Sequence, residues 1–333
     1  MKFRWQLAAC AAAMMCAATQ VDAQTFSAKF GTATLNDAQH TWVKNYAAAL
    51  ERDSGGRIKA EVFPASQLGT IPRMIEQTQF GSIQLWAGPP EFLYGVDPRF
   101  ELLTAPGLFK NIEQTNKVLQ DPLFAEPFEA IGEKKGLVGV GLFLTGPEAF
   151  LLRKPIHKLE DFAGLKIRVL ASPMQVDPIR ALGASPVPMS LGEVLPALQQ
   201  GALDGVMGGL PVFEPLGYAD AVKYFVDTQH AMITGIGVVS RKWLQSLPPD
   251  LQKIVIADGH KVSAELFPVT KQKLDASTEN WKKSGGVVVP FDPQESAKLM
   301  AMLKPITEKI VEAHPVEKPM YELLKAAIAR AGQ

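Results

Sequence analysis

The chain has 333 residues, 47% of them hydrophobic, with 34 basic and 34 acidic side chains. Balanced charge without a basic stripe or a charged tail excludes the electrostatic footprint of a nucleic-acid-binding protein, so we expect no nucleic-acid partner. The length and the hydrophobic content suffice for a sizeable core and favour two domains or lobes.

The N-terminus has the layout of a secretory signal peptide. Lys2 and Arg4 precede an apolar stretch over residues 7–18, which is too short to span a membrane and is followed by small residues. We predict a cleaved signal peptide over residues 1–23 and a periplasmic mature protein. The four residues that end at Cys10 also resemble a lipoprotein box, so acylation of this cysteine stays open as an alternative route.

Both cysteines, Cys10 and Cys16, lie in this leader. The mature chain is therefore expected to contain neither disulfides nor thiolate metal sites. Cleavage of the leader removes two basic residues and one acidic residue, so the mature chain keeps 34 − 2 = 32 basic and 34 − 1 = 33 acidic side chains. The mature protein stays electrically balanced, and its stability must come from its core.

Strand and helix patterns alternate along the chain, which predicts an α/β fold. Alternating or continuous apolar runs predict strands over residues 26–31, 58–62, 82–87, 137–144, 165–170 and 287–289. Capping residues and apolar residues at helical spacing predict helices from Asn36-Asp37 to Gly55-Gly56, from near Pro72 to Gly81, over 176–182, over 193–200, over most of 249–283, and from there to the C-terminus. Gly259 and Pro268 should break or kink the long segment.

Catalytic motifs are sparse. The five histidines are scattered, and the chain contains no His-Glu-x-x-His, no Gly-x-Ser-x-Gly and no phosphate loop. The glycine pairs at 139 and 141 and at 235 and 237 lack the third glycine of a dinucleotide fingerprint, and we interpret them as close-packed strand positions. We therefore predict a protein without metal or cofactor that is not an enzyme. Distant residues can still assemble a catalytic triad, so a secreted enzyme stays open as an alternative.

Arg168 is the strongest candidate for a functional residue. It interrupts the apolar strand predicted over residues 165–170, where a buried charge needs a partner. Its planar guanidinium suits a carboxylate held by two parallel hydrogen bonds. The structural alternatives are a surface arginine on an edge strand, or an arginine paired to a protein acid such as Asp161 or Glu193.

Residues 159–206 resemble the substrate-binding subunits of TRAP transporters, the DctP-like periplasmic proteins. The motifs that carry this resemblance are GLKIRV at 164–169, LGASPVPM at 182–189, and EV-x-x-ALQ-x-G-x-x-DG from Glu193 to Gly205. GGRIKAEVFPASQLG at 55–69 and LPPDLQKIV at 247–255 extend the similarity over most of the mature chain.

The resemblance implies a two-lobed α/β fold, like that of type II periplasmic binding proteins, with a long helix spanning both lobes. The first lobe would comprise residues 24–145 plus about 234–273, and the second lobe residues 146–233 plus about 274–333. It also implies that Arg168 binds the carboxylate of a small organic acid. The other ligand-binding candidates are Trp86, Pro89, Glu91, Glu148, Ser172, Leu191, Met207, Gly208 and Phe213.

The candidate pocket departs from that of the sialic-acid-binding members of the family. They carry a second arginine where this chain has Glu148, and polar or acidic contacts where it has Leu191 and Pro89. Arg153 is nearby in sequence as a substitute for that arginine. Fewer polar groups favour a smaller or more apolar acid, such as a monocarboxylate, an oxo acid or an aromatic acid.

The expected mechanism is capture by lobe closure followed by delivery to a membrane transporter. The resemblance implies integral membrane small and large TRAP subunits as partners, with import driven by an ion gradient. We expect a monomer. A binding subunit of another transporter or of a sensor system is the alternative reading.

Overall fold

The computed structural model describes residues 24–332, which form a mixed α/β fold around a nine-stranded sheet. The predicted signal peptide and both cysteines lie outside the described residues. Within the described part of the chain, no helix combines the length and the apolar character needed to cross a membrane.

The strands confirm most of the predicted ones. They are β1 (Phe26–Thr32), β2 (Ile58–Phe63), β3 (Leu85–Gly88), β4 (Leu137–Leu152), β5 (Lys166–Val169), β6 (Ser185–Pro188), β7 (Gly205–Gly208), β8 (Tyr224–Ser240) and β9 (Val287–Pro290). The strand predicted from residue 82 begins only at Leu85. Gly81 adopts a left-handed conformation, and the N–H groups of Ser82 and Ile83 turn back to the carbonyl of Gln77.

The α-helices surround this sheet. They are α2 (Ala38–Asp53), α3 (Ile71–Phe80), α4 (Ile112–Leu119), α5 (Pro122–Glu129), α6 (Pro173–Ala181), α7 (Leu191–Gln199), α8 (Leu210–Phe213), α9 (Arg241–Ser246), α10 (Pro249–Glu265), α11 (Phe267–Lys283), α12 (Pro293–Ala313) and α13 (Lys318–Ala331). Short 3-10 helices are η1 (Pro90–Leu93), η2 (Pro98–Thr104), η3 (Ala130–Lys135), η4 (Leu159–Phe162) and η5 (Tyr218–Asp220).

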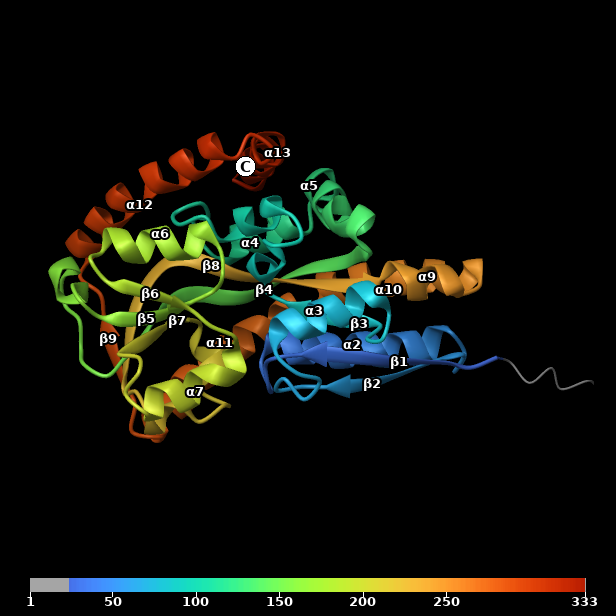
Figure 1. The fold of residues 1–333 in the computed structure, drawn as a ribbon, viewed down its shortest axis with the longest axis horizontal. Coiled ribbons are helices and arrows are strands. Elements are labelled where there is room, and N and C mark those ends of the chain that lie inside the picture. The colour runs from blue at the N-terminus through green and yellow to red at the C-terminus, as the bar shows by residue number, and fades with distance from the viewer. Residues whose placement is uncertain (1–23, 333) are drawn as a thin grey trace, which may run out of the picture.

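Two long antiparallel strands join the lobes. The sheet order is β2-β1-β3-β8-β4-β7-β5-β6, with β9 also paired to β8, so β8 and β4 stand between the first-lobe and second-lobe strands. Figure 1 shows β1, β2, β3, α2 and α10 on one side of the molecule and β5, β6, β7, α6 and α7 on the other. The register of β4 against β8 shifts between Leu144 and Gly146, opposite Thr234 and Ile233. The predicted lobe boundaries stay a proposal, which this irregularity supports.

The predicted long helix consists of two helices in series. α10 ends at Glu265, and α11 begins at Phe267 with Pro268 in its first turn, where a missing N–H costs nothing. The prediction of a break at Gly259 is wrong. This glycine continues α10 and lets the helix touch β4, since a Cβ there would lie 2.0 Å from the carbonyl oxygen of Val140.

The glycine pairs of β4 and β8 are close-packed, as predicted. A Cβ on Gly237 would lie 2.1 Å from the Trp42 ring, and one on Gly235 would lie 2.1 Å from the Phe143 ring. These two rings stack with centroids 5.0 Å apart, and the Trp42 indole donates to Ser263 Oγ at 2.9 Å. Because these glycines have no side chain, the large aromatic rings of the first-lobe core can pack directly against the strands.

Candidate functional site

Arg168 lies in the interior of the sheet. β5 runs between β7 and β6, and Arg168 is opposite Val206 on one side and Val187 on the other. Only 3% of the residue is exposed. The structure therefore excludes a surface arginine on an edge strand.

The guanidinium has little to bind within the protein. Its Nε donates to the backbone carbonyl of Met189 at 3.0 Å, and its Cζ lies 6.0 Å from the centroid of the Phe92 ring. Among residues 24–332, no carboxylate oxygen lies within 4.0 Å of it. The proposed acid partners are engaged elsewhere, because Asp161 accepts from the N–H of His157 at 3.1 Å. Glu193 likewise accepts from the N–H of the residue that caps α7.

Burial lowers the pKa of Arg168 to about 10, although Tyr218 and Glu148 partly offset this effect. The side chain remains charged at neutral pH, because the lowered pKa still lies about three units above it. A buried positive charge with one backbone acceptor is costly unless an anion completes its environment.

The arginine faces a small cavity between the lobes. The volume open to the centres of water-sized molecules is about 40 Å³. The first lobe contributes lining residues from β1 to α2, from α3 and from β3 to η1, and the second lobe contributes them from β5, α7 and the segment from β7 to α8. Six of the predicted residues line this cavity: Trp86, Pro89, Arg168, Leu191, Gly208 and Phe213.

Two aromatic side chains that line the cavity pack directly against glycines. A Cβ on Gly88 would lie 2.4 Å from the Trp86 ring, and one on Gly208 would lie 2.6 Å from the Phe213 ring. Both rings are fully buried, and the Trp86 indole N–H has no acceptor among the described residues. The cavity therefore combines apolar walls with donors that lack acceptors.

Sequence reasoning missed the polar side chains that complete the lining, namely Thr34, Gln39 and Thr145. Gln39 Nε2 donates to Thr32 Oγ1 at 2.6 Å, and Thr145 Oγ1 donates to the carbonyl of Ile233 at 2.8 Å. Their donors are thus used within the protein. These residues come from separate loops and strands and form no sequence motif, so only the fold brings them together.

A buried acid that interacts with the charge of Arg168 is paired to a buried imidazole, and neither side chain lines the cavity. Glu148 Oε2 accepts from Gln175 Nε2 at 3.1 Å and lies 3.7 Å from His230 Nε2. Burial raises the pKa of Glu148 to about 7, an effect that Gln175 and Arg168 reduce. Burial also lowers the pKa of His230 to about 4, so this imidazole is neutral at neutral pH.

The remaining predicted residues lie outside the lining. Glu91 is fully buried in η1, and burial followed by repulsion from neighbouring acids raises its pKa well above the usual range. Met207 points into the second-lobe core formed around Phe150. Ser172 borders a different hollow, between α6 and α12. Arg153 donates to backbone carbonyls, including that of Leu203, and does not reach the cavity.

Two lobes that enclose a small cavity, with an arginine of one lobe facing it, define the class of solute-binding proteins. Comparison with known proteins gives the family. The family model of "Bacterial extracellular solute-binding protein, family 7" (DctP) matches residues 30–314. The chain belongs to this family.

Two relatives illustrate the sequence similarity. An uncharacterized protein of Salmonella typhimurium, YiiZ, is 32% identical over 62% of this chain and 64% of its own length. The sialic acid-binding periplasmic protein SiaP of Vibrio cholerae is 25% identical over 84% of this chain and 87% of its own length.

Two crystal structures illustrate the similarity of the fold. A TRAP periplasmic solute-binding protein from Desulfovibrio salexigens, with bound orotic acid, has a TM-score of 0.86 and 24% identity and covers 92% of this chain and 100% of that one. Another from Xanthobacter autotrophicus Py2, with bound β-D-galacturonate, has a TM-score of 0.83 and 27% identity and covers 90% of this chain and 99% of that one. The family and its two-lobed fold, predicted from the sequence, are thereby confirmed, and the chain is a solute-binding protein of the TRAP type.

Proposed function

We propose that this protein captures a small organic acid in the periplasm by pairing its carboxylate with Arg168, and delivers it to the membrane subunits of a TRAP transporter. The buried guanidinium carries this proposal. It faces the cavity and has no protein carboxylate within 4.0 Å among the described residues. The acidic solutes of the Vibrio and Xanthobacter relatives support a carboxylate as the ligand.

The lining favours a compact acid with an apolar body. Trp86, Leu191 and Phe213 supply apolar walls, and the donors of Gln39 and Thr145 are already engaged. A heavily hydroxylated sugar acid would leave several hydroxyl groups unpaired, at about 1 to 3 kcal/mol for each. A monocarboxylate, an oxo acid or an aromatic acid fits better.

Closure of the lobes would complete the site. The carboxylate first meets the second lobe at Arg168, and the first lobe brings Trp86 and Pro89 over the rest of the solute. Exclusion of water strengthens the ion pair because the effective dielectric constant falls. The closed form is then the state that the small and large membrane subunits would recognise.

A thermal-shift panel of carboxylates, sulfonates, amino acids and neutral sugars tests the proposal on the mature chain. A ligand at a thousand times its dissociation constant adds about 4 kcal/mol of stability. The expected result is stabilisation by a group of related small carboxylates. The response should persist in Arg180→Ala, because Arg180 lines the separate hollow between α6 and α12 and pairs with Asp177 at 3.0 Å. Loss of the response in this variant, or a response to neutral solutes alone, would contradict the proposal.

A further inference from the structure

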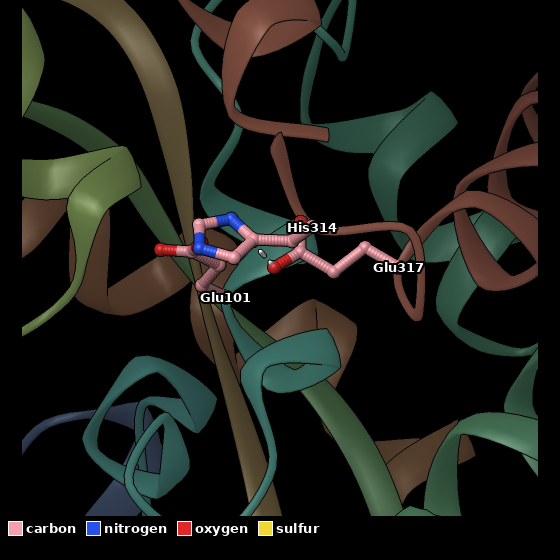
Figure 2. A group of neighbouring side chains, drawn as sticks. All are labelled: Glu101, His314 and Glu317. Atoms are coloured by element: carbon pink, nitrogen blue, oxygen red, sulfur yellow. Dashed lines mark ion pairs between the residues drawn. The ribbon is translucent and has the colours of Figure 1, made fainter. Parts of the chain in front are cut away.

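A second polar cluster lies away from the arginine cavity, where the turn after α12 meets η2. Glu101 belongs to η2, His314 caps the C-terminus of α12, and Glu317 caps the N-terminus of α13. Figure 2 shows the three side chains converging from these two parts of the chain. One potential ligand atom from each side chain lies within 4.8 Å of the others.

The two carboxylates are buried without enough partners. Glu101 and Glu317 are both 0% exposed. Neither oxygen of Glu317 has a hydrogen-bond partner among residues 24–332, and Oε1 of Glu101 has none either. Within the described part of the chain, no lysine or arginine nitrogen lies within 4.0 Å of these acids. The protein thus supplies acceptors here without the donors or the positive charge that buried acids need.

From this geometry we infer that Glu101, His314 and Glu317 form a binding site for one divalent transition-metal cation such as Zn²⁺. Two carboxylates and an imidazole are a ligand set that zinc accepts, with water in the remaining position. The His314 Nδ1 atom lies 3.5 Å from Glu317 Oε1. The imidazole and the carboxylates therefore lie close enough to share one ion.

Charge and orientation agree with a cation at this position. Two ionised carboxylates and one divalent cation are together neutral, which suits a buried site. A second contact fixes Glu101, whose Oε2 accepts from the Met174 N–H at 2.9 Å. His314 Nδ1 lies 3.0 Å from the carbonyl oxygen of Ile310, a contact that orients the imidazole and leaves Nε2 as the nitrogen that can bind the ion.

The site has a route to solvent. The side chain of His314 is 34% exposed and lines the hollow between α6 and α12, whose volume is about 710 Å³. A hydrated ion can reach the imidazole from this hollow and then exchange water for the two carboxylates. Occupancy would fasten the turn between α12 and α13 to η2 and, through Glu101, to the start of α6.

Metal binding by the intact mature chain, stripped with a chelator and free of an affinity tag, tests this inference. Calorimetry and equilibrium dialysis with Zn²⁺ alone should show one ion per chain, and Co²⁺ alone should give the visible absorption of a low-coordinate site. We expect His314→Ala and Glu317→Gln each to weaken Zn²⁺ binding at least tenfold. His260→Ala is the matched control, because His260 forms the separate 2.7 Å pair with Glu129.

The Glu317→Gln variant separates metal binding from folding. It removes a buried charge without changing the side-chain shape, so the metal-free variant should melt no lower than the wild type. Zn²⁺ should raise the melting temperature of the wild type and of His260→Ala, and should leave that of Glu317→Gln unchanged. Equal Zn²⁺ affinity in wild type, His314→Ala and Glu317→Gln, or no Zn²⁺ bound by the wild type, would overturn the inference. Carboxylate binding at Arg168 should be unaffected by His314→Ala, so the two sites are tested independently.

Discussion

Replacement of Arg168 by methionine is the most informative perturbation of the arginine cavity. The variant keeps the apolar stem and removes the charge that faces the cavity. It loses the 3.0 Å hydrogen bond to the Met189 carbonyl, worth about 1.5 to 3 kcal/mol for a charged donor. It also removes an unpaired buried charge whose desolvation costs several kcal/mol. We therefore expect the unliganded variant to be as stable as the wild type or more stable.

The same change should be severe for ligand binding. Removal of one partner of a buried, hydrogen-bonded charge pair costs about 2 to 5 kcal/mol, or about 30-fold to several-thousand-fold in affinity. Calorimetry with the acid that most stabilises the wild type measures this loss, and thermal unfolding without ligand measures the fold. An affinity within about threefold of wild type would refute the assignment of Arg168 as the carboxylate-binding residue. A large fall in the stability of the unliganded variant would instead show that the arginine is structural.

Three further predictions follow from other contacts. Burial raises the pKa of Glu148 to about 7, so a ligand anion should bind up to about tenfold more tightly at pH 6 than at pH 8, and Glu148→Gln should flatten this pH dependence in calorimetry. Gly259→Ala should lower the unfolding midpoint in urea. A Cβ 2.0 Å from the Val140 carbonyl oxygen costs more than the roughly 1 kcal/mol of helix propensity that alanine gains. A higher midpoint would contradict the close contact between α10 and β4. The hydrogen bond to Glu129 raises the pKa of His260. The stability that this pair contributes is therefore complete below the ordinary histidine pKa and is lost as the pH rises through the raised pKa. His260→Gln should lower the melting temperature more at pH 5.5 than at pH 8.5.

The sequence predicted those helices and strands whose capping residues and apolar pattern lie close together in the chain. Asp37 caps α2 by accepting from the N–H of His40 at 2.8 Å, and Gly55 follows the helix in a left-handed conformation, as the sequence indicated. The full extents of β4 and β8 were not predicted. β4 continues past Gly146 to Leu152 only because β8 pairs with it along both lobes, and the partners of these residues lie 72 to 87 positions later in the chain, at Tyr224 and Ile233.

The residues of the candidate site also differ in whether the sequence alone could identify them. Arg168 was identified because a charge inside an apolar strand is conspicuous in one sequence window, and the family motif around it is continuous. Met207 was expected at the cavity, but strand alternation turns it to the opposite face, into the second-lobe core. The cluster of Glu101, His314 and Glu317 had no sequence signal, because η2 and the turn after α12 meet only in the folded chain.

A crystal structure of the mature protein with its stabilising acid tests the central claim most directly. Two carboxylate oxygens of the ligand should each lie about 2.7 to 2.9 Å from nitrogens of the Arg168 guanidinium, with Trp86 and Phe213 against the body of the acid. A ligand bound in the hollow between α6 and α12, or one whose carboxylate avoids Arg168, would contradict the account.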